Sequence, residues 1–76
     1  MQKELFQKTF ANNLALARKK IGYTQKEVSF LLNISTSTLA NYEVGKRYPN
    51  PETIKKIIDL YDISADWLFN TNPNRK

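Results

Sequence analysis

Residues 24–43, TQKEVSFLLNISTSTLANYE, contain two short helical segments in direct succession, and this stretch decides the fold. Thr24 and Glu27 form the Thr-x-x-Glu pattern of a capping box, which predicts a helix over 25–32. Asn33 follows, and asparagine is the residue other than glycine that most readily accepts the left-handed backbone conformation at a helix end. The chain must therefore turn sharply after the first segment.

Ser35 has the position of a second N-cap and predicts a helix over 36–43. This segment is poor in apolar residues, so it buries one narrow stripe that includes at most Leu39 and Tyr42. Its other side is short and polar, and we interpret it as a candidate recognition surface. That surface carries Thr36, Ser37 and Asn41.

A longer helical pattern precedes this pair. Apolar residues recur every three or four positions and keep to one face, which predicts a helix over 4–21. Gly22 stands just beyond it as a left-handed stop. The apolar stripe consists of Phe6, Phe10, Leu14, Ala17 and Ile21.

Two further helices are expected after the pair. Pro51 suits the first position of a helix over 51–61, whose core stripe is Ile54, Ile57, Ile58 and Tyr61. Ser64 has the position of an N-cap for a last short helix over 65–69. Within it, Trp67 and either Leu68 or Phe69 are expected to close the core.

The whole chain reads as one all-α domain of five helices. A chain of 76 residues is long enough for a single core, and 41% apolar with 25% charged residues is typical of an ordinary globular protein. We expect the domain to occupy residues 1–69. Residues 70–76 contain the turn-forming sequence Asn-Pro-Asn and no apolar residue that could pack on the core. They predict a flexible C-terminal tail.

The composition excludes several classes of function. The chain contains no Cys and no His, so disulfides, the usual zinc sites and imidazole catalysis are not available. It also lacks an acidic cluster at metal-binding spacing. We therefore expect no catalytic residue, no metal and no cofactor. Apolar runs are short and no signal peptide is visible, which indicates a cytoplasmic protein that does not enter membranes.

The net charge of +5 is unevenly distributed. Residues 18–47 contain six Lys or Arg against two Glu, whereas residues 48–74 contain two Lys against four acidic residues. A basic end favours a polyanionic partner such as nucleic acid. On charge alone, a surface that is simply hydrated explains the pattern equally well.

The two short helices joined through residues 32–35 have the form of a helix-turn-helix, in which the second helix can enter a DNA major groove. Short connections are common in purely structural helical hairpins, so the hairpin alone leaves function open. A more specific pattern runs through most of the chain and consists of Leu14-x-x-x-Arg18, Gly22-Tyr23-Thr24-Gln25-x-Glu27-Val28, Leu32-Asn33-Ile34-Ser35-x-Ser37-Thr38-Leu39-x-x-Tyr42-Glu43-x-Gly45-Lys46-Arg47-x-Pro49, Thr53-Ile54 and Ile63-Ser64-x-Asp66-Trp67-Leu68. With these residues, the chain resembles the repressor and Cro-type (XRE-like) helix-turn-helix family from Phe10 to Phe69. The resemblance implies a five-helix, lambda-repressor-like DNA-binding domain.

The resemblance also implies which residues meet DNA. Thr36, Ser37 and Asn41 would face the bases, where the Asn carboxamide matches the N6 and N7 edge of adenine. Phosphate contacts would come from the start of the first short helix, from one residue of the second, and from the loop after it. These are Gln25, Lys26, Thr38, Lys46, Arg47 and Tyr48. A hydrated polar surface remains the alternative for the same residue types.

Arg18 and Glu43 are interpreted differently, as a partly buried structural salt bridge that the resemblance implies. The sequence also departs from the family pattern. Asn33 and Asp62 stand where Gly is usual. Phe30 and Leu31 occupy positions that usually face solvent, where an apolar pair could form a protein-binding surface.

Two functional hypotheses follow. The first is a transcriptional regulator, preferably a repressor, that binds double-stranded DNA as a homodimer in the bacterial or phage-type cytoplasm and is associated with the nucleoid. Its two recognition helices would enter successive major grooves about 34 Å apart. The alternative is a protein-interaction module of the same fold, such as an antitoxin-like or anti-repressor-bound regulator. Its contact would be Phe30, Leu31 or the region of Trp67.

Overall fold

Five helices and no strand make up residues 2–69, the part of the chain whose backbone the computed structural model describes; side chains are described from residue 7. The helices are α1 (Gln2–Ile21), α2 (Gln25–Leu32), α3 (Thr36–Glu43), α4 (Pro51–Tyr61) and α5 (Ala65–Leu68). The expected stripe residue Phe6 and the expected tail over 70–76 lie outside what is described. The fold is all-α, as expected.

Two helix ends differ from the expected positions. α1 begins at Gln2 and not at residue 4, and α5 ends at Leu68, with Phe69 as its C-cap. Differences of one or two residues are usual at helix ends, where the hydrogen-bond ladder is incomplete. The other expected ends coincide with those of the structure.

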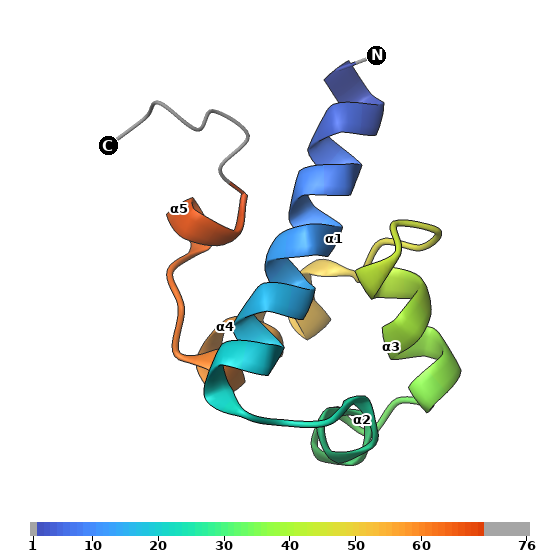
Figure 1. Ribbon diagram of the computed structural model, residues 1–76, viewed down its shortest axis with the longest axis vertical. Helices are drawn as coiled ribbons and strands as arrows, with labels where there is room; N and C mark the ends of the chain where they lie inside the picture. Colours follow the sequence, from blue (N-terminus) through green and yellow to red (C-terminus); the bar gives the residue numbers. More distant parts are fainter. Residues whose placement is uncertain (1, 70–76) are drawn as a thin grey trace.

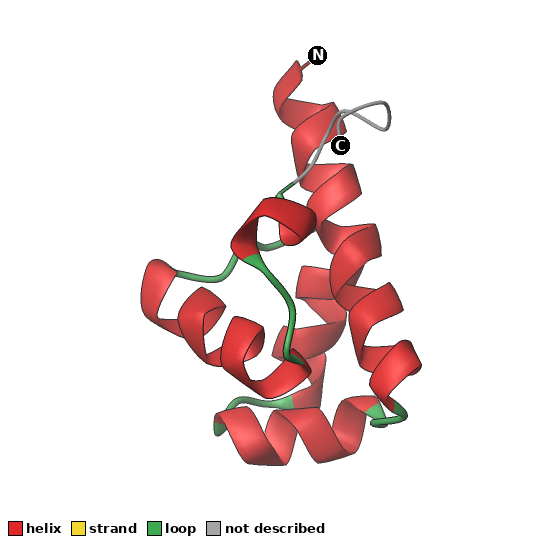
Figure 2. Cartoon of the chain, turned by 90° about the vertical axis from the view of Figure 1, so that its left-hand side faces the viewer, coloured by secondary structure: helices red, strands yellow, loops and turns green. Residues whose placement is uncertain are grey.

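The long helix α1 is the central element, and α3, α4 and α5 each pack against it (Figure 1). α2 packs on α3 and α4 and lies across the end of the molecule where α1 finishes. In the view of Figure 1, α3 and α5 lie on opposite sides of α1. Figure 2 shows the loop that connects α4 to the short helix α5. α3 is thus held on one side of the central helix, and α2 is held at its end by α3 and α4.

The core draws on all five helices. Its largest fully buried side chains include Phe10, Leu14, Leu39, Ile57 and Leu68. Burial of such a side chain contributes roughly 1.5–3 kcal/mol to folding. The complete buried cluster is Phe10, Leu14, Ala17, Val28, Leu32, Leu39, Tyr42, Ile57, Tyr61 and Leu68.

Two residues expected in the core lie outside it. Ile21 and Trp67 are both 41% exposed. Ile21 is the last residue of α1, where the chain turns at Gly22 with φ 95°, and its side chain lines an open pocket beside Tyr61. α5 is one turn long and can bury only one side; Leu68 faces inward, which turns its neighbour Trp67 outward. Phe69 completes this part of the core, with its ring 5.3 Å from that of Phe10.

Local hydrogen bonds fix the ends of the short helices. The capping box of α2 is complete: the Glu27 amide donates to Thr24 Oγ1 over 3.0 Å, and the Thr24 amide donates to Glu27 Oε1 over 2.8 Å. Ser35 caps α3 with one such bond, which its hydroxyl accepts from the Thr38 amide over 3.0 Å. Each such cap is worth about 1 kcal/mol. Short helices with few apolar residues therefore have defined starting points.

Among the described helices, none has the length and apolar character needed to cross a membrane.

Candidate nucleic-acid interface

The turn between α2 and α3 is closed by a Schellman motif. Asn33 adopts φ 59° and ψ 45°, the left-handed conformation expected for it. The Ile34 amide donates to the Ser29 carbonyl over 3.0 Å, and the Asn33 amide donates to the Phe30 carbonyl over 3.2 Å. This pair of bonds satisfies the last carbonyl groups of α2 and reverses the chain direction. The angle at which α3 leaves α2 is therefore set by the backbone.

α3 has one buried side and one exposed side. Leu39, Tyr42 and Glu43 are buried. Thr36 and Ser37, two of the three expected base readers, are exposed, and Asn41 is partly buried on the same side. Thr36 and Ser37 are therefore accessible to a partner, and Asn41 is partly accessible beside them.

Two apolar residues of the same exposed side were missed by sequence reasoning. Val44, the C-cap of α3, is 66% exposed, and Ala40 is partly exposed. Together with Thr36 they follow the spacing i, i+4, i+8, which places them along one helix face. This spacing was readable in the sequence, but only polar side chains were considered as readers.

A buried salt bridge joins α1 to the C-terminal end of α3. Arg18 Nε lies 2.7 Å from Glu43 Oε2 and Arg18 Nη2 lies 3.0 Å from Oε1, which makes the contact bidentate. The two side chains are only 11% and 5% exposed. Hydrogen bonding to Glu43 raises the pKa of Arg18 above its ordinary value, against the opposing effect of burial. Arg18 Nη1 also donates to the Tyr23 carbonyl over 2.9 Å.

Gln25 belongs to the same network. Its Nε2 donates to Glu43 Oε1 over 3.0 Å, so this amide, expected only as a phosphate donor, already holds an internal partner. One N–H of the amide and its oxygen remain for other partners. The bond joins the first residue of α2 to the last residue of α3, which are 18 positions apart, and nothing in the sequence pattern points to it.

The hydrogen bond between Gln25 and Glu43 brings together basic residues of α2 and of the loop after α3. Because Gln25 reaches the end of α3, Lys26 and the loop after α3 lie at the same end of the helix pair. The loop folds back, since the amides of Lys46 and Arg47 donate to the Asn41 carbonyl over 3.0 and 3.2 Å. All three basic side chains are exposed.

The other two expected phosphate contacts are more constrained. Thr38 is partly buried, and its Oγ1 lies 2.8 Å from Ser35 Oγ, within the cap of α3. Tyr48 packs its ring 4.7 Å from that of Phe10, and burial raises the pKa of its hydroxyl. The Tyr48 side chain is still 42% exposed. Both therefore contribute to the packing of the domain at the edge of the candidate interface.

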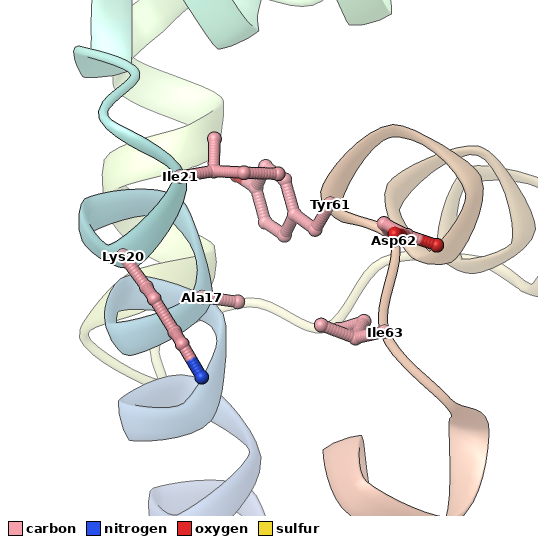
Figure 3. A pocket seen from close by; sticks show the side chains of 6 residues that line it. All are labelled: Ala17, Lys20, Ile21, Tyr61, Asp62 and Ile63. Atoms are coloured by element: carbon pink, nitrogen blue, oxygen red, sulfur yellow. The ribbon is translucent and has the colours of Figure 1, made fainter.

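A pocket lies away from α3, between the end of α1 and the connection from α4 to α5 (Figure 3). Tyr61 lines it, and its buried hydroxyl has no hydrogen-bond partner within the described residues. Burial, and next the nearby charge of Glu43, raise the pKa of Tyr61. The lining consists of Ala17, Lys20, Ile21, Tyr61, Asp62 and Ile63. Within residues 7–69, no group of acidic side chains has the arrangement of a metal site.

Comparison with known proteins identifies the class. The sequence profile of the helix-turn-helix family matches residues 14–68, which include α2, α3 and both partners of the buried salt bridge. The chain therefore belongs to the helix-turn-helix family, of the repressor and Cro type, and its relatives are named as transcriptional regulators.

Three relatives illustrate the range of similarity. The HTH-type transcriptional regulator ImmR of Bacillus subtilis is 43% identical over 61 residues, which cover 80% of this chain and 48% of ImmR. AnsR of the same organism is 32% identical over 65 residues, 86% of this chain and 56% of AnsR. The cryptic phage CTXphi transcriptional repressor RstR of Vibrio cholerae is 38% identical over 55 residues, 72% of this chain and 49% of RstR.

The chain spans about half the length of these relatives. No solved structure matches it significantly.

Proposed function

We propose that this helix-turn-helix regulator represses transcription by binding a specific sequence of double-stranded DNA, with α3 in the major groove. The observation that carries the proposal is the exposed side of α3, a row of short polar groups with basic residues at its edge. Base edges carry sequence information, whereas phosphates supply affinity at every sequence. The base readers we propose are Thr36, Ser37 and Asn41.

The proposed phosphate contacts surround this surface. Lys26 and the loop residues Lys46 and Arg47 are exposed at the end of the helix pair and would neutralise phosphates. Gln25 would add its remaining N–H at the N-terminus of α2, where backbone amides also favour an anion. Thr38 and Tyr48 would contact the backbone at the edge. Arg18 and Glu43 would hold α1 and α3 in place without touching DNA.

Repression and cellular location rest on the relatives. RstR is named as a transcriptional repressor of a phage, and ImmR and AnsR as bacterial regulators. On that basis we place the action of this protein in the cytoplasm of a bacterial cell, at the nucleoid.

Selection from a random duplex library tests the proposal directly. A chain that reads sequence should enrich a defined site and bind it roughly a thousandfold or more tightly than a scrambled duplex at the same salt concentration. Equal affinity for the selected and scrambled duplexes would contradict sequence-specific binding. The scrambled duplex has the same length and base composition, which makes it the matched control.

We also propose that the protein pairs as a homodimer on DNA through residues 60–69. Trp67 is exposed on α5, the helix that lies opposite α3 across α1 in Figure 1, and Tyr61, Asp62 and Ile63 of the same segment line part of a pocket. A domain of this size has little surface for a large permanent interface, so the free protein should be a monomer or weak dimer. Sedimentation with and without the selected duplex tests this. A tight tetramer, or independent binding of single half-sites, would refute it.

A specific observation favours the second candidate function, a protein-interaction module. Phe30 is 83% exposed and its neighbour Leu31 is also exposed, which is unusual for large apolar side chains on a small domain. Capture of a stoichiometric protein partner that Phe30→Ser abolishes, together with no binding to any duplex, would favour this function over DNA recognition.

A further inference from the structure

The exposed side of α3 consists of two neighbouring stripes of different chemistry. One stripe, Ser37 and Asn41, offers hydrogen-bonding groups. The other, Thr36, Ala40 and Val44, offers methyl groups at successive turns of the helix. Residues four apart lie above one another on a helix, so each stripe runs along the helix axis.

Val44 is the strongest element of the methyl stripe. Its side chain is 66% exposed and lies outside the buried cluster, so packing within the described residues does not account for an apolar residue there. It follows Asn41 by three positions, which places it on the same side of the helix as the proposed adenine reader. An apolar group in that place is available to an apolar partner from outside the domain.

α3 also lacks the side chains that recognise guanine. Bidentate contact with guanine O6 and N7 is made by Arg or Lys, and residues 36–43 contain neither. The nearest basic side chains are Lys46 and Arg47, which follow the end of the helix. Their amides are bound to the Asn41 carbonyl, which holds their backbone beyond the last turn of α3.

An A·T base pair matches both stripes. In the major groove it presents adenine N6 and N7 beside thymine O4 and the thymine 5-methyl group. We propose, on the basis of the function proposed above, that α3 reads a half-site core of A·T base pairs. Asn41 accepts and donates at adenine, and Val44, supported by Ala40 and Thr36, packs on the methyl group of a thymine.

Replacement of thymine by deoxyuridine tests the proposal, since it removes the methyl group and leaves base pairing unchanged. The probe is the duplex recovered by selection from the random library, with each half-site thymine replaced in turn. For the wild-type protein, at least one replacement should weaken binding by about fourfold per half-site, the value expected for one buried methyl group. Val44→Ala shortens a largely exposed side chain, so the variant should fold, and in it that replacement should have no effect.

Leu16→Ala is the matched control, because Leu16 is also an exposed apolar residue but lies on α1. It should keep the full sensitivity to deoxyuridine. A selected half-site with G·C pairs at its core, or sensitivity that persists in Val44→Ala or disappears in Leu16→Ala, would overturn the inference and leave the proposed function intact. Failure to enrich any duplex would overturn both.

Discussion

Gln25, the first residue of α2, donates a hydrogen bond of 3.0 Å to Oε1 of Glu43, the last residue of α3. The acceptor is the same carboxylate that Arg18 grips with two nitrogens. One buried carboxylate thus links α1, α2 and α3. A group with three donors around it is satisfied only while all three elements keep their places.

A second carboxylate beside Glu43 should disturb this network in a pH-dependent way. Gln25→Glu places like charges in contact, which raises the folded-state pKa of the introduced acid and lowers stability at pH 7 by up to about 1 kcal/mol. The loss is present above the ordinary pKa of glutamate and disappears as the pH falls below about 4 and the acid takes up its proton. Urea unfolding at both pH values measures it.

Gln25→Met is the control for that experiment, because it removes the hydrogen bond and adds no charge. Its stability difference from wild type should stay constant between the two pH values. Equal pH dependence in the two variants would mean that residue 25 does not face Glu43 in solution.

Removal of Arg18 should have a much larger effect. Arg18→Met leaves the buried Glu43 charge without its ion-pair partner, and we expect a loss of about 3 kcal/mol in the free energy of unfolding. An exposed ion pair would cost at most about 1 kcal/mol. Arg18→Met combined with Glu43→Leu should recover part of the loss. Denaturant unfolding measures the loss in Arg18→Met. A loss of less than about 1 kcal/mol would mean that the ion pair is exposed to solvent.

Tyr61→Phe should leave stability at pH 7 unchanged or raise it, because the lost hydroxyl is buried without a hydrogen-bond partner in the described part of the chain. Burial raises the pKa of Tyr61, so the folded state keeps the proton that an unfolded tyrosine releases near pH 10. Below about pH 10 the tyrosine is protonated in both states and causes no pH-dependent change in stability, and as the pH rises further its ionisation favours the unfolded state. Alkaline unfolding should therefore be less steep in Tyr61→Phe, and an unchanged slope would assign the effect to other groups.

The loss of a base contact and the loss of a phosphate contact should affect DNA binding differently. Asn41→Ala is expected to cost roughly 1 to 3 kcal/mol on the selected site and to abolish the preference at one base pair per half-site. Lys46→Ala should weaken selected and scrambled duplexes alike and reduce the slope of log affinity against log salt by about one per contact. Affinities of both duplexes over a salt series separate the two. Identical uniform losses would reassign Asn41 to the DNA backbone.

Local sequence signals explain the helix ends that were predicted correctly. The ends of α2 and α3 depend on Thr24, Glu27 and Ser35, whose capping bonds span three residues and act before any tertiary contact. Asn33 adopts the left-handed conformation expected of it for the same local reason.

The features that were predicted wrongly or missed depend on tertiary structure. Whether Trp67 or Leu68 faces inward depends on how a one-turn helix meets α1, where Asn13 Nδ2 donates to the carbonyls of both residues over 3.1 Å. Ile21 continues the apolar spacing of α1, but as the last residue of that helix it is left exposed. The bond from Gln25 to Glu43 depends on the packing of two helices, and no spacing encodes it.

The separation of buried and exposed residues on α3 has a consequence for how such a regulator can diverge. The residues that hold α3 in the fold are Leu39, Tyr42 and Glu43, and none of them lies on the outward stripes. If Ser37 and Val44 read bases as proposed, substitutions at either residue would change the recognised operator with little effect on folding. Two descendants of one ancestral gene could acquire separate operators by a few such changes, each remaining stable at every step.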